Sequence, residues 1–374
     1  MTFQTHDSTM QAAVLTGHGG PARIELVDDH PRPAAGPGEV LIQVGAAGIN
    51  NTDVWSREGA YSADPEQPEG WRGVPLSFPR IQGGDVAGTI TAVGDGVPES
   101  RIGQRVLVNA LLYGDDGNLL EAGLLGSERD GGFAEYVTVP AANAHPVAGR
   151  LSDAELATFP IAWLTALHML NRARLAAGER VVVTGASGGV GTALVALAAA
   201  RGAQVTAVSS RAKFEHITAL GASACLDRSH ELTPDAVCAA AGGAPDVVAD
   251  VVGGGMFAPL FEALAPGGRF VTAGAIAGAR VTLDLRRLYL PHREVIGSTM
   301  GTQAEFAELV ELIESGRLEP QLAGTWPLSR IHDAQRAFDE KGFAGKLVLI
   351  PDARWEANTP ETNWEAGNEE AANA

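Results

Sequence analysis

The 374-residue chain has only two cysteines, Cys225 and Cys238. Two cysteines cannot build the disulfide framework that holds small secreted domains together. No apolar run reaches the roughly 20 residues that a membrane-spanning helix needs. The polar segment Met1–Gln11 lacks the apolar stretch of a signal peptide. We therefore expect a cytoplasmic protein that neither depends on disulfides nor crosses a membrane.

Positive charge is also scarce, with 27 Lys and Arg against 45 Asp and Glu and a net charge of −18. Nucleic acids and anionic membrane surfaces are bound through clustered Lys and Arg side chains. The charge balance therefore argues against both as partners, and we expect the ligand to be a small molecule.

Glycine, by contrast, is abundant at 46 residues, and 45% of the chain is apolar. An apolar fraction of that size is typical of globular proteins. The length, divided by roughly 150 residues per domain, predicts about two domains. The many glycines indicate tight turns and places where the backbone comes close to another group.

The first part of the chain, 11–147, predicts a β-rich domain, because short β-prone segments are separated by turns that contain Gly and Pro. The expected strands are Ala12–Leu15, Glu39–Ala46, Gly88–Val93, Arg105–Asn109 and Ala134–Val139. Two long polar loops, 59–80 and 113–132, are expected between them. Loops of that length in a compact domain are usually either functional or partly disordered.

From about Ser152 the pattern changes to strands that alternate with helices. Ser152, followed by the acidic residues Asp153 and Glu155, is typical of a helix N-cap and first turn and predicts the start of a helix. The apolar β-branched segments that follow, such as Val181–Thr184 and Gln204–Val208, predict a parallel sheet covered by helices on both faces. The last strand, Gly345–Ile350, is expected to return to the first domain. The fold class is therefore α/β, with a β-rich domain beside a doubly wound parallel sheet.

The segment 181–191 predicts a loop that binds a dinucleotide. Its glycines follow the G-x-x-G-x-x-G pattern between a predicted strand and a predicted helix. Gly185 allows a tight turn, Gly188 lets the backbone approach a pyrophosphate, and Gly191 lets the helix pack against the strand. The free N–H groups at the helix start then face the anion. The residues expected to bind are Gly185, Ser187, Gly188, Gly189, Val190 and Gly191.

The end of the next predicted strand selects between the two nicotinamide dinucleotides. For NAD, an Asp or Glu is expected there to hold the ribose 2′-hydroxyl. The chain instead has Ser209, Ser210, Arg211 and Lys213. A hydroxyl with two cations suits a 2′-phosphate, so these residues favour NADPH over NADH. The alternative is that Arg211 and Lys213 are ordinary charged residues at a helix start.

Several motifs together resemble the medium-chain dehydrogenase/reductase superfamily, and in particular its zinc-free quinone oxidoreductase branch, which includes zeta-crystallin. The resemblance covers about residues 10–351. It is carried by Gly48–Asp53, Arg57–Tyr61, Pro79–Gly88, Leu164–Ala166, Gly185–Gly191, Leu220–Ala222 and Asp246–Asp250.

The resemblance implies a GroES-like catalytic domain over residues 10–155, completed by 310–351, and a Rossmann NADPH-binding domain over 156–309. Residues 352–374 show no periodicity, and we expect a disordered acidic tail there. In this superfamily two Rossmann sheets pair edge to edge through their late strands. The corresponding stretch here, Val271–Val281 followed by Glu294–Thr299, is apolar and short of charge, so a homodimer is expected.

Metal ligands are missing at the positions where the zinc enzymes of the superfamily have them. Asn50 replaces the Cys that lies three residues before Asp53, and Gly84 replaces the His that precedes Asp85. The stretch 109–132 lacks the four Cys of the structural zinc lobe. We therefore expect no metal. Without zinc to lower the pKa of an alcohol, reduction of an activated double bond is favoured over alcohol oxidation.

The resemblance also implies roles for three residues. Asn50 matches an Asn near the nicotinamide and could donate to a developing enolate oxygen; the alternative is an Asn that only stabilises a turn. Tyr61 matches a pocket Tyr that could orient a carbonyl or relay a proton; the alternative is a packing role. Thr165 is expected beside the nicotinamide. Trp55 stands where relatives often have a second Tyr, which removes a hydroxyl from the expected pocket.

These features together predict a zinc-independent NADPH oxidoreductase that transfers a hydride to a quinone or to an α,β-unsaturated carbonyl. Asp85 and Lys346 are expected to form a buried structural pair. Three alternatives stay open. They are an enoyl-thioester reductase, a non-catalytic NADPH-binding protein of the crystallin type, and an alcohol dehydrogenase.

Overall fold

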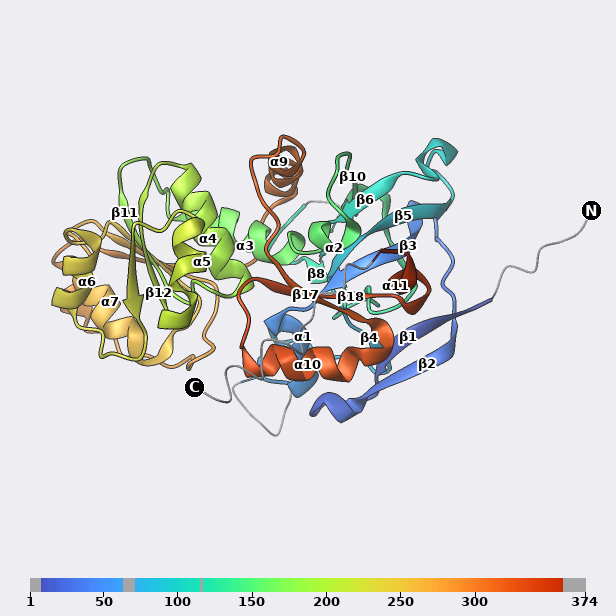
Figure 1. The fold of residues 1–374 in the computed structure, drawn as a ribbon, viewed down its shortest axis with the longest axis horizontal. Coiled ribbons are helices and arrows are strands. Elements are labelled where there is room, and N and C mark those ends of the chain that lie inside the picture. Colours follow the sequence, from blue (N-terminus) through green and yellow to red (C-terminus); the bar gives the residue numbers. More distant parts are fainter. Residues whose placement is uncertain (1–7, 63–70, 115–116, 359–374) are drawn as a thin grey trace, which may run out of the picture. The chain divides into compact units, whose positions relative to one another are not determined.

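The computed structural model describes residues 8–62, 71–114 and 117–358. Parts of the two long loops and the tail residues 359–374 lie outside the described residues. The chain forms two compact units (Figure 1). Of the described residues, those within 8–160, 320–342 and 346–358 form the β-rich unit, and those within 161–319 and 343–345 form the parallel-sheet unit.

The main sheet of the β-rich unit has the strand order β10-β6-β5-β3-β18-β17, with β9 paired to β3. These strands are β3 (Glu39–Gly48), β5 (Asp85–Val93), β6 (Arg105–Val108), β9 (Tyr136–Pro140), β10 (Ala144–Pro146), β17 (Leu322–Pro327) and β18 (Lys346–Ile350). β18 pairs antiparallel with β3, with Val348 opposite Gly48. The prediction that the last strand returns to the first domain is therefore confirmed.

Smaller sheets and short helices complete the β-rich unit. Its remaining strands are β1 (Thr9–Leu15), β2 (Ile24–Pro31), β4 (Arg80–Ile81), β7 (Leu111–Leu112) and β8 (Gly123–Leu124). Its helices are α1 (Asn51–Glu58), α2 (Asp153–Leu156), α10 (Ile331–Glu340) and α11 (Asp352–Asn358). Ser152 caps α2 as the sequence predicts, because its hydroxyl accepts from the Glu155 N–H. Helix α10 buries residues at helical spacing, including Ile331, Ala334 and Phe338.

The parallel-sheet unit has the strand order β13-β12-β11-β14-β15-β16, and every neighbouring pair is parallel. The strands are β11 (Arg180–Val183), β12 (Gln204–Ser209), β13 (Ala224–Asp227), β14 (Val247–Asp250), β15 (Arg269–Thr272) and β16 (Glu294–Gly297). This order, 3-2-1-4-5-6, is that of the Rossmann fold, so the predicted fold class is confirmed. The order reverses between β11 and β14, which is where such sheets bind their ligands.

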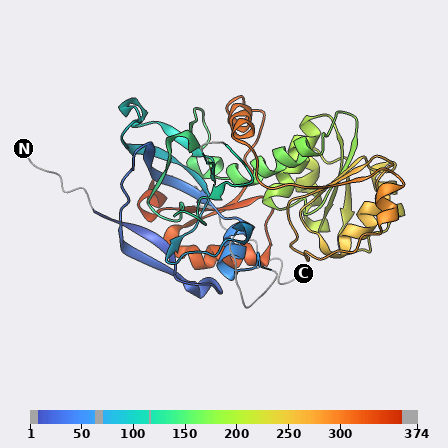
Figure 2. The ribbon, with the colours of Figure 1, turned by 180° about the vertical axis from the view of Figure 1, so that it is seen from behind.

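Helices cover the two faces of this sheet, with α4 and α5 on one side and α6 and α7 on the other (Figures 1 and 2). The helices are α3 (Pro160–Arg172), α4 (Gly189–Ala200), α5 (Phe214–Ala219), α6 (Pro234–Ala241), α7 (Phe257–Ala263), α8 (Leu285–Tyr289) and α9 (Gln303–Glu314). Apolar strand residues such as Val182, Val208 and Val248 pack with Leu260 and Phe270 in one core. Strands buried on both faces read as continuous apolar runs, which explains the sequence pattern.

Two predictions about the chain's organisation need correction. Residues 310–319 were expected to complete the catalytic domain, but they belong to the parallel-sheet unit. Helix α9 runs without a break to Glu314, and its apolar side chains, among them Phe306 and Ile313, are buried. Residues 352–358 were expected to begin the disordered tail, but they form α11. Asp352 holds its start, because its carboxylate accepts from the Ser329 N–H at 3.0 Å.

Candidate active site

The loop after β11 has the backbone that the glycine pattern predicts. Gly185 has a φ of +56°, a conformation that side-chain-bearing residues rarely adopt. A Cβ at Gly191 would lie 2.0 Å from the Gly185 carbonyl oxygen, so the helix can pack this closely only with glycine there. At Gly188 the nearest atom to an added Cβ would be 3.5 Å away. Packing within the chain therefore explains Gly185 and Gly191, whereas Gly188 leaves open space.

Helix α4 begins directly after this loop, with Gly188 as its N-cap. The N–H groups of its first turn, including Gly189, Val190 and Gly191, have no partner within the helix, and N–H groups of this kind can bind an anion. The Ser187 backbone is fixed, since its carbonyl accepts from the Gly345 N–H at 3.0 Å. The structure thus brings the six predicted loop residues together at the start of one helix.

Asp250 is a buried carboxylate that links β11 and β14, the two strands at the switch point. In the sequence it is only the last residue of the motif Asp246–Asp250. Thr184, after β11, donates its hydroxyl proton to Asp250 at 2.6 Å, and the Gly253 N–H donates to the same carboxylate at 3.0 Å. Burial raises the pKa of Asp250. A carboxylate at the end of an apolar strand is the signal that could have indicated this role. Asp250 fixes the loop that leaves β14 beside the glycine loop.

The residues expected to bind the 2′-phosphate lie at the end of β12. Ser209 is buried, Ser210 precedes a short helical turn, and Arg211 is exposed. Lys213 is held within the unit, because its ammonium donates to the Phe343 carbonyl oxygen at 2.6 Å. Burial lowers the pKa of Lys213, and the nearby charge of Arg228 lowers it further. Of the two predicted cations, only Arg211 is freely exposed.

Thr165 lies on α3 with little exposure, and its hydroxyl donates to the Ile161 carbonyl oxygen at 2.7 Å. Its oxygen lies 3.7 Å from the Met300 sulfur. Met300 has a φ of +49°, a strained backbone of the kind that clusters at functional sites. No sequence motif marks Met300. The following Gly301 is the one signal of a close approach to α3, because an added Cβ there would lie 2.6 Å from the Leu164 side chain.

In the β-rich unit, Asn50 belongs to a buried polar cluster and keeps 7% of its surface exposed. Its side-chain nitrogen donates to Asp85 at 2.9 Å, and its oxygen accepts from the Lys346 ammonium at 2.6 Å. Lys346 also bonds Asp85 at 2.7 Å and the Ile49 carbonyl oxygen at 2.8 Å. The expected Asp85–Lys346 pair is therefore confirmed. Because an ammonium can only donate, Lys346 fixes which way the Asn50 amide points.

Asp53 is a second buried carboxylate of this cluster. It accepts the backbone N–H groups of Asn50 at 2.8 Å and of Gly83 at 3.2 Å, and it thereby caps α1. Burial raises its pKa to about 7, and the charge of Asp85 adds to the shift, while these hydrogen bonds and Lys346 oppose it. In the sequence, Asp53 only served to locate Asn50 as the position of the missing Cys ligand. The N-x-x-D spacing of a capping box is the signal that could have identified it.

Tyr61 follows the other end of α1, two residues after the C-cap Gly59. Its hydroxyl donates to the Thr52 oxygen at 3.3 Å, and its ring meets Trp55 edge to face with the ring centres 5.4 Å apart. Burial raises the pKa of Tyr61 to about 12. The phenol therefore stays protonated at neutral pH and can donate a hydrogen bond, but it releases its proton less readily than an exposed Tyr.

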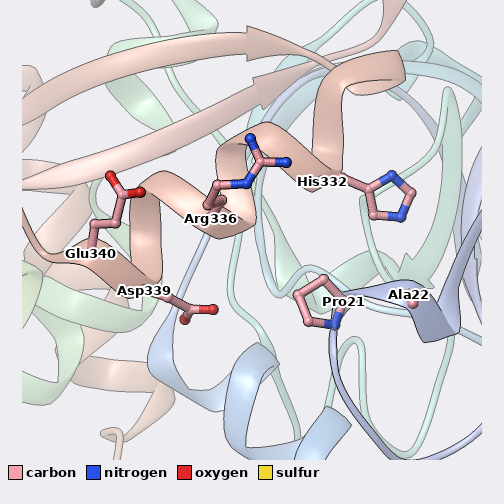
Figure 3. Close-up of a pocket in the computed structure, with 6 residues that line it drawn as sticks. All are labelled: Pro21, Ala22, His332, Arg336, Asp339 and Glu340. Carbon is pink, nitrogen blue, oxygen red and sulfur yellow. The ribbon is translucent and has the colours of Figure 1, made fainter. Parts of the chain in front are cut away.

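A surface hollow of about 670 Å³ lies elsewhere in the β-rich unit, along α10 (Figure 3). It is lined by Pro21, Ala22, His332, Arg336, Asp339 and Glu340. None of the predicted site residues contributes to it. Among the described residues, no group of three His, Cys, Asp or Glu side chains is placed to hold a metal ion. Within the same residues, no helix is long and apolar enough to cross a membrane.

Comparison with protein families gives two matches. Residues 36–149 match the alcohol dehydrogenase GroES-like domain, and residues 189–315 match the zinc-binding dehydrogenase domain. Among curated proteins, acryloyl-coenzyme A reductase from Metallosphaera sedula is 30% identical, with 91% of this chain and 99% of the relative covered. Quinone oxidoreductase from Rattus norvegicus is 28% identical, with coverages of 92% and 99%.

Three solved structures are also similar. A putative alcohol dehydrogenase from Sinorhizobium meliloti is 51% identical, with a TM-score of 0.89 and coverages of 92% and 97%. A cobalt- and zinc-bound alcohol dehydrogenase from Pyrobaculum aerophilum is 36% identical, with a TM-score of 0.79 and coverages of 91% and 99%. An NAD-dependent alcohol dehydrogenase is 32% identical, with a TM-score of 0.83 and coverages of 91% and 99%. Together with the GroES-like and Rossmann units, these similarities show that the chain belongs to the medium-chain dehydrogenase/reductase superfamily of nicotinamide-dependent oxidoreductases.

Proposed function

We propose that the protein is a zinc-independent, NADPH-dependent oxidoreductase that reduces a quinone or an α,β-unsaturated carbonyl. The observation that carries this proposal is the cluster around Asn50. Where zinc relatives place a Cys ligand, this chain has an amide whose oxygen is bonded to the Lys346 ammonium at 2.6 Å. A metal ion at that oxygen would stand beside a positive charge, and an amide is a poor zinc ligand. A metal-bound relative at 36% identity makes metal content the first point to measure.

The chain's own groups fit the stabilisation of an enolate. The bound nicotinamide supplies the hydride, which adds to the electron-poor carbon and leaves negative charge on the carbonyl oxygen. One hydrogen of the Asn50 amide is held by Asp85, whereas the other makes only a long contact of 3.5 Å to the Gly48 carbonyl oxygen. That second hydrogen can donate to the substrate oxygen. The Tyr61 hydroxyl, whose hydrogen makes a long bond of 3.3 Å to the Thr52 oxygen, would donate to the substrate by giving up that bond.

The proposed preference for NADPH rests on the end of β12. Ser209 and Ser210 stand where NAD-binding members carry a carboxylate, and the exposed Arg211 follows them. Relatives differ in this respect, since one at 32% identity is an NAD-dependent enzyme. The sign of the charge at this strand end supports NADPH here, because a guanidinium attracts a 2′-phosphate and a carboxylate repels it.

An enoyl-thioester reductase is the second candidate, favoured by the similarity to acryloyl-coenzyme A reductase. A coenzyme A substrate needs a basic rim for its phosphates. Arg80, at the end of the 59–80 loop, forms an ion pair with Asp130 at 2.8 Å. This pairing argues against a free basic rim at that end of the loop.

A substrate panel tests the proposal. Oxidation of NADPH is followed with a simple quinone, an enone and an enoyl-coenzyme A, and reduction of NADP with primary alcohols, before and after treatment with a chelator. We expect turnover of the quinone or enone, NADPH preferred over NADH, and metal analysis with far less than one zinc per chain. One zinc per chain with alcohol oxidation that the chelator abolishes would contradict it. Absence of any turnover would favour the non-catalytic crystallin type.

A further inference from the structure

The end of β13 brings a second arginine next to the end of β12. The two strands are parallel, with Ser209 opposite Asp227. The Arg228 N–H donates to the Ser209 carbonyl oxygen at 2.9 Å. Arg228 therefore leaves the sheet directly beside the serine with which the proposed 2′-phosphate site begins, although 19 positions separate the two in the chain.

The positions of the neighbouring charges make Arg228 a better phosphate ligand than Lys213. The Lys213 ammonium is already bonded to the Phe343 carbonyl oxygen at 2.6 Å. The Arg228 side chain is exposed and forms no ion pair with any residue that the structure describes. It borders a hollow of about 450 Å³ that is also lined by His230, Thr233 and Met256. An exposed guanidinium at the wall of a hollow is free to turn toward a bound anion.

Charge repulsion at this edge of the sheet also supports the binding of an anion there. The charge of Arg228 lowers the pKa of Lys213, so the two cations lie close enough to repel each other. An anion bound by Arg228 and Arg211 would offset the positive charge of Arg228 and so relieve that repulsion without contacting Lys213. Asp227 also lies here, but its carboxylate is occupied by the Ser229 N–H at 3.0 Å, and Arg211 lies near enough to lower its pKa. The edge therefore offers two exposed guanidinium groups, one from each strand end.

We propose that Arg228 and Arg211 together grip the ribose 2′-phosphate of NADPH, and that Lys213 serves as a structural tether to Phe343. The inference rests on the proposed preference for NADPH, which it deepens by naming the second specificity-determining residue. Two planar guanidinium groups can each form paired hydrogen bonds with phosphate oxygens, whereas an ammonium bonded to a carbonyl oxygen has fewer hydrogens left for a ligand.

The test compares two small probes that differ in the 2′-phosphate alone, adenosine 2′,5′-bisphosphate and adenosine 5′-monophosphate. Their Kd values are measured by calorimetry on the full-length protein. The parent chain should bind the bisphosphate more tightly. Arg228→Met should reduce the ratio of the two Kd values by about tenfold, the effect of losing one charge-assisted hydrogen bond. Arg317→Met, which removes an exposed guanidinium from elsewhere in the same unit, is the matched control and should leave the ratio unchanged.

Three results would overturn the inference in distinguishable ways. Equal binding of both probes by the parent chain would contradict the NADPH preference itself. A selective loss in Arg211→Ala but not in Arg228→Met would keep that preference and contradict the role of Arg228. If Lys213→Met selectively weakens binding of the bisphosphate, then Lys213 is the second cation that binds the 2′-phosphate. If Lys213 is a tether, Lys213→Met should lower the melting temperature and weaken both probes to a similar degree.

Discussion

Two glycines of the same loop are required for different reasons, although the sequence pattern treats them alike. Gly191 has no room for a Cβ, because the Gly185 carbonyl oxygen would lie 2.0 Å from it. Gly188 has room, and its extended backbone is one that any residue adopts. A requirement for glycine at 188 can therefore come only from something outside the chain, which the proposal identifies as the pyrophosphate.

This difference predicts opposite effects for two alanine variants. Gly191→Ala should lower stability by about 1–3 kcal/mol, because the overpacked Cβ pushes the helix away from the backbone of Gly185 and Ala186. Gly188→Ala should change stability by less than about 0.5 kcal/mol but raise the Kd of NADPH by about tenfold. Urea unfolding and fluorescence titration of the cofactor measure the two effects. Normal cofactor affinity in Gly188→Ala would mean that this loop does not carry the pyrophosphate.

Asp53 gives the β-rich unit a pH dependence whose direction follows from its pKa. The folded chain raises this pKa from 3.8 to about 7, mainly through burial. The folded state therefore holds the proton more tightly than the unfolded chain does. The contribution of this group to stability is fully present below pH 3.8, and it is lost as the pH rises through about 7.

Asp53→Asn should remove that dependence, because the amide keeps the shape of the carboxyl and does not ionise. We expect the free energy of unfolding of the parent chain to fall between pH 3.8 and about pH 7, and that of the variant to fall less. Asp29→Asn, which changes an exposed carboxylate in the same unit, provides the comparison and should follow the parent chain. Parallel profiles for parent and Asp53→Asn would refute the assignment.

At the level of elements, Glu305 anchors two helices that lie far apart in the sequence. It completes the capping box at the start of α9 by accepting from the Thr302 N–H at 2.8 Å. It also accepts from His168 at 2.8 Å and from Asn171 at 2.7 Å, both on α3. Burial alone would raise the pKa of Glu305, but these hydrogen bonds lower it to about 2. The same connection fixes the segment that carries Met300 against the helix that carries Thr165.

Glu305→Ala should therefore destabilise the chain by about 2–3 kcal/mol, since a cap and a partly buried ionic hydrogen bond are both lost. A depressed pKa stabilises the folded state above 4.5, and this stabilisation disappears as the pH falls toward 2. The difference between parent and variant should shrink over the same range in chemical unfolding. Glu311→Ala, at an exposed position of the same helix, should cost little by comparison.

The sequence predicted the strands of the parallel sheet well, because strands buried on both faces have an unmistakable apolar pattern. It missed α10, although the buried residues of that helix recur at helical spacing. It also missed α1, and there the reason is physical. Helix α1 is eight residues long and buries polar side chains, including Asp53 and Arg57, so it shows no apolar stripe. Its caps at Asn50 and Gly59 are hydrogen-bonding features that hydrophobic periodicity does not report. The Asp85–Lys346 pair was predictable only through the family resemblance, since no local pattern links positions this far apart.

For the whole molecule, the outer edge of the parallel sheet predicts self-association. β16 is the last strand of the sheet, and no other described strand pairs with its outer side. Val295 on this strand is exposed, as are Leu285, Tyr289 and Leu290 just before it. An unprotected apolar edge of this kind is normally covered. We propose that two copies pair here about a twofold axis.

Light scattering should accordingly give twice the mass of one chain, and Val295→Lys should shift the equilibrium toward the monomer by placing like charges across the axis. Arg317→Lys, away from this edge, should leave the mass unchanged. A parent chain that is monomeric at the concentrations of the assay would contradict the proposal, and a dimer that survives Val295→Lys would place the interface elsewhere.

Residues 343–345 belong to the parallel-sheet unit, although their chain neighbours on both sides belong to the β-rich unit. The Phe343 carbonyl oxygen accepts a hydrogen bond from the Lys213 ammonium, and the Gly345 N–H donates to the Ser187 carbonyl oxygen in the glycine loop. The continuous segment 161–319 is therefore not the complete parallel-sheet unit and should not be exchanged between homologues by itself. A chimera that exchanges 161–319 alone would place the glycine loop of one parent against the tripeptide of the other. Recombination between homologues is expected to succeed most often when segments 161–319 and 343–345 come from the same parent.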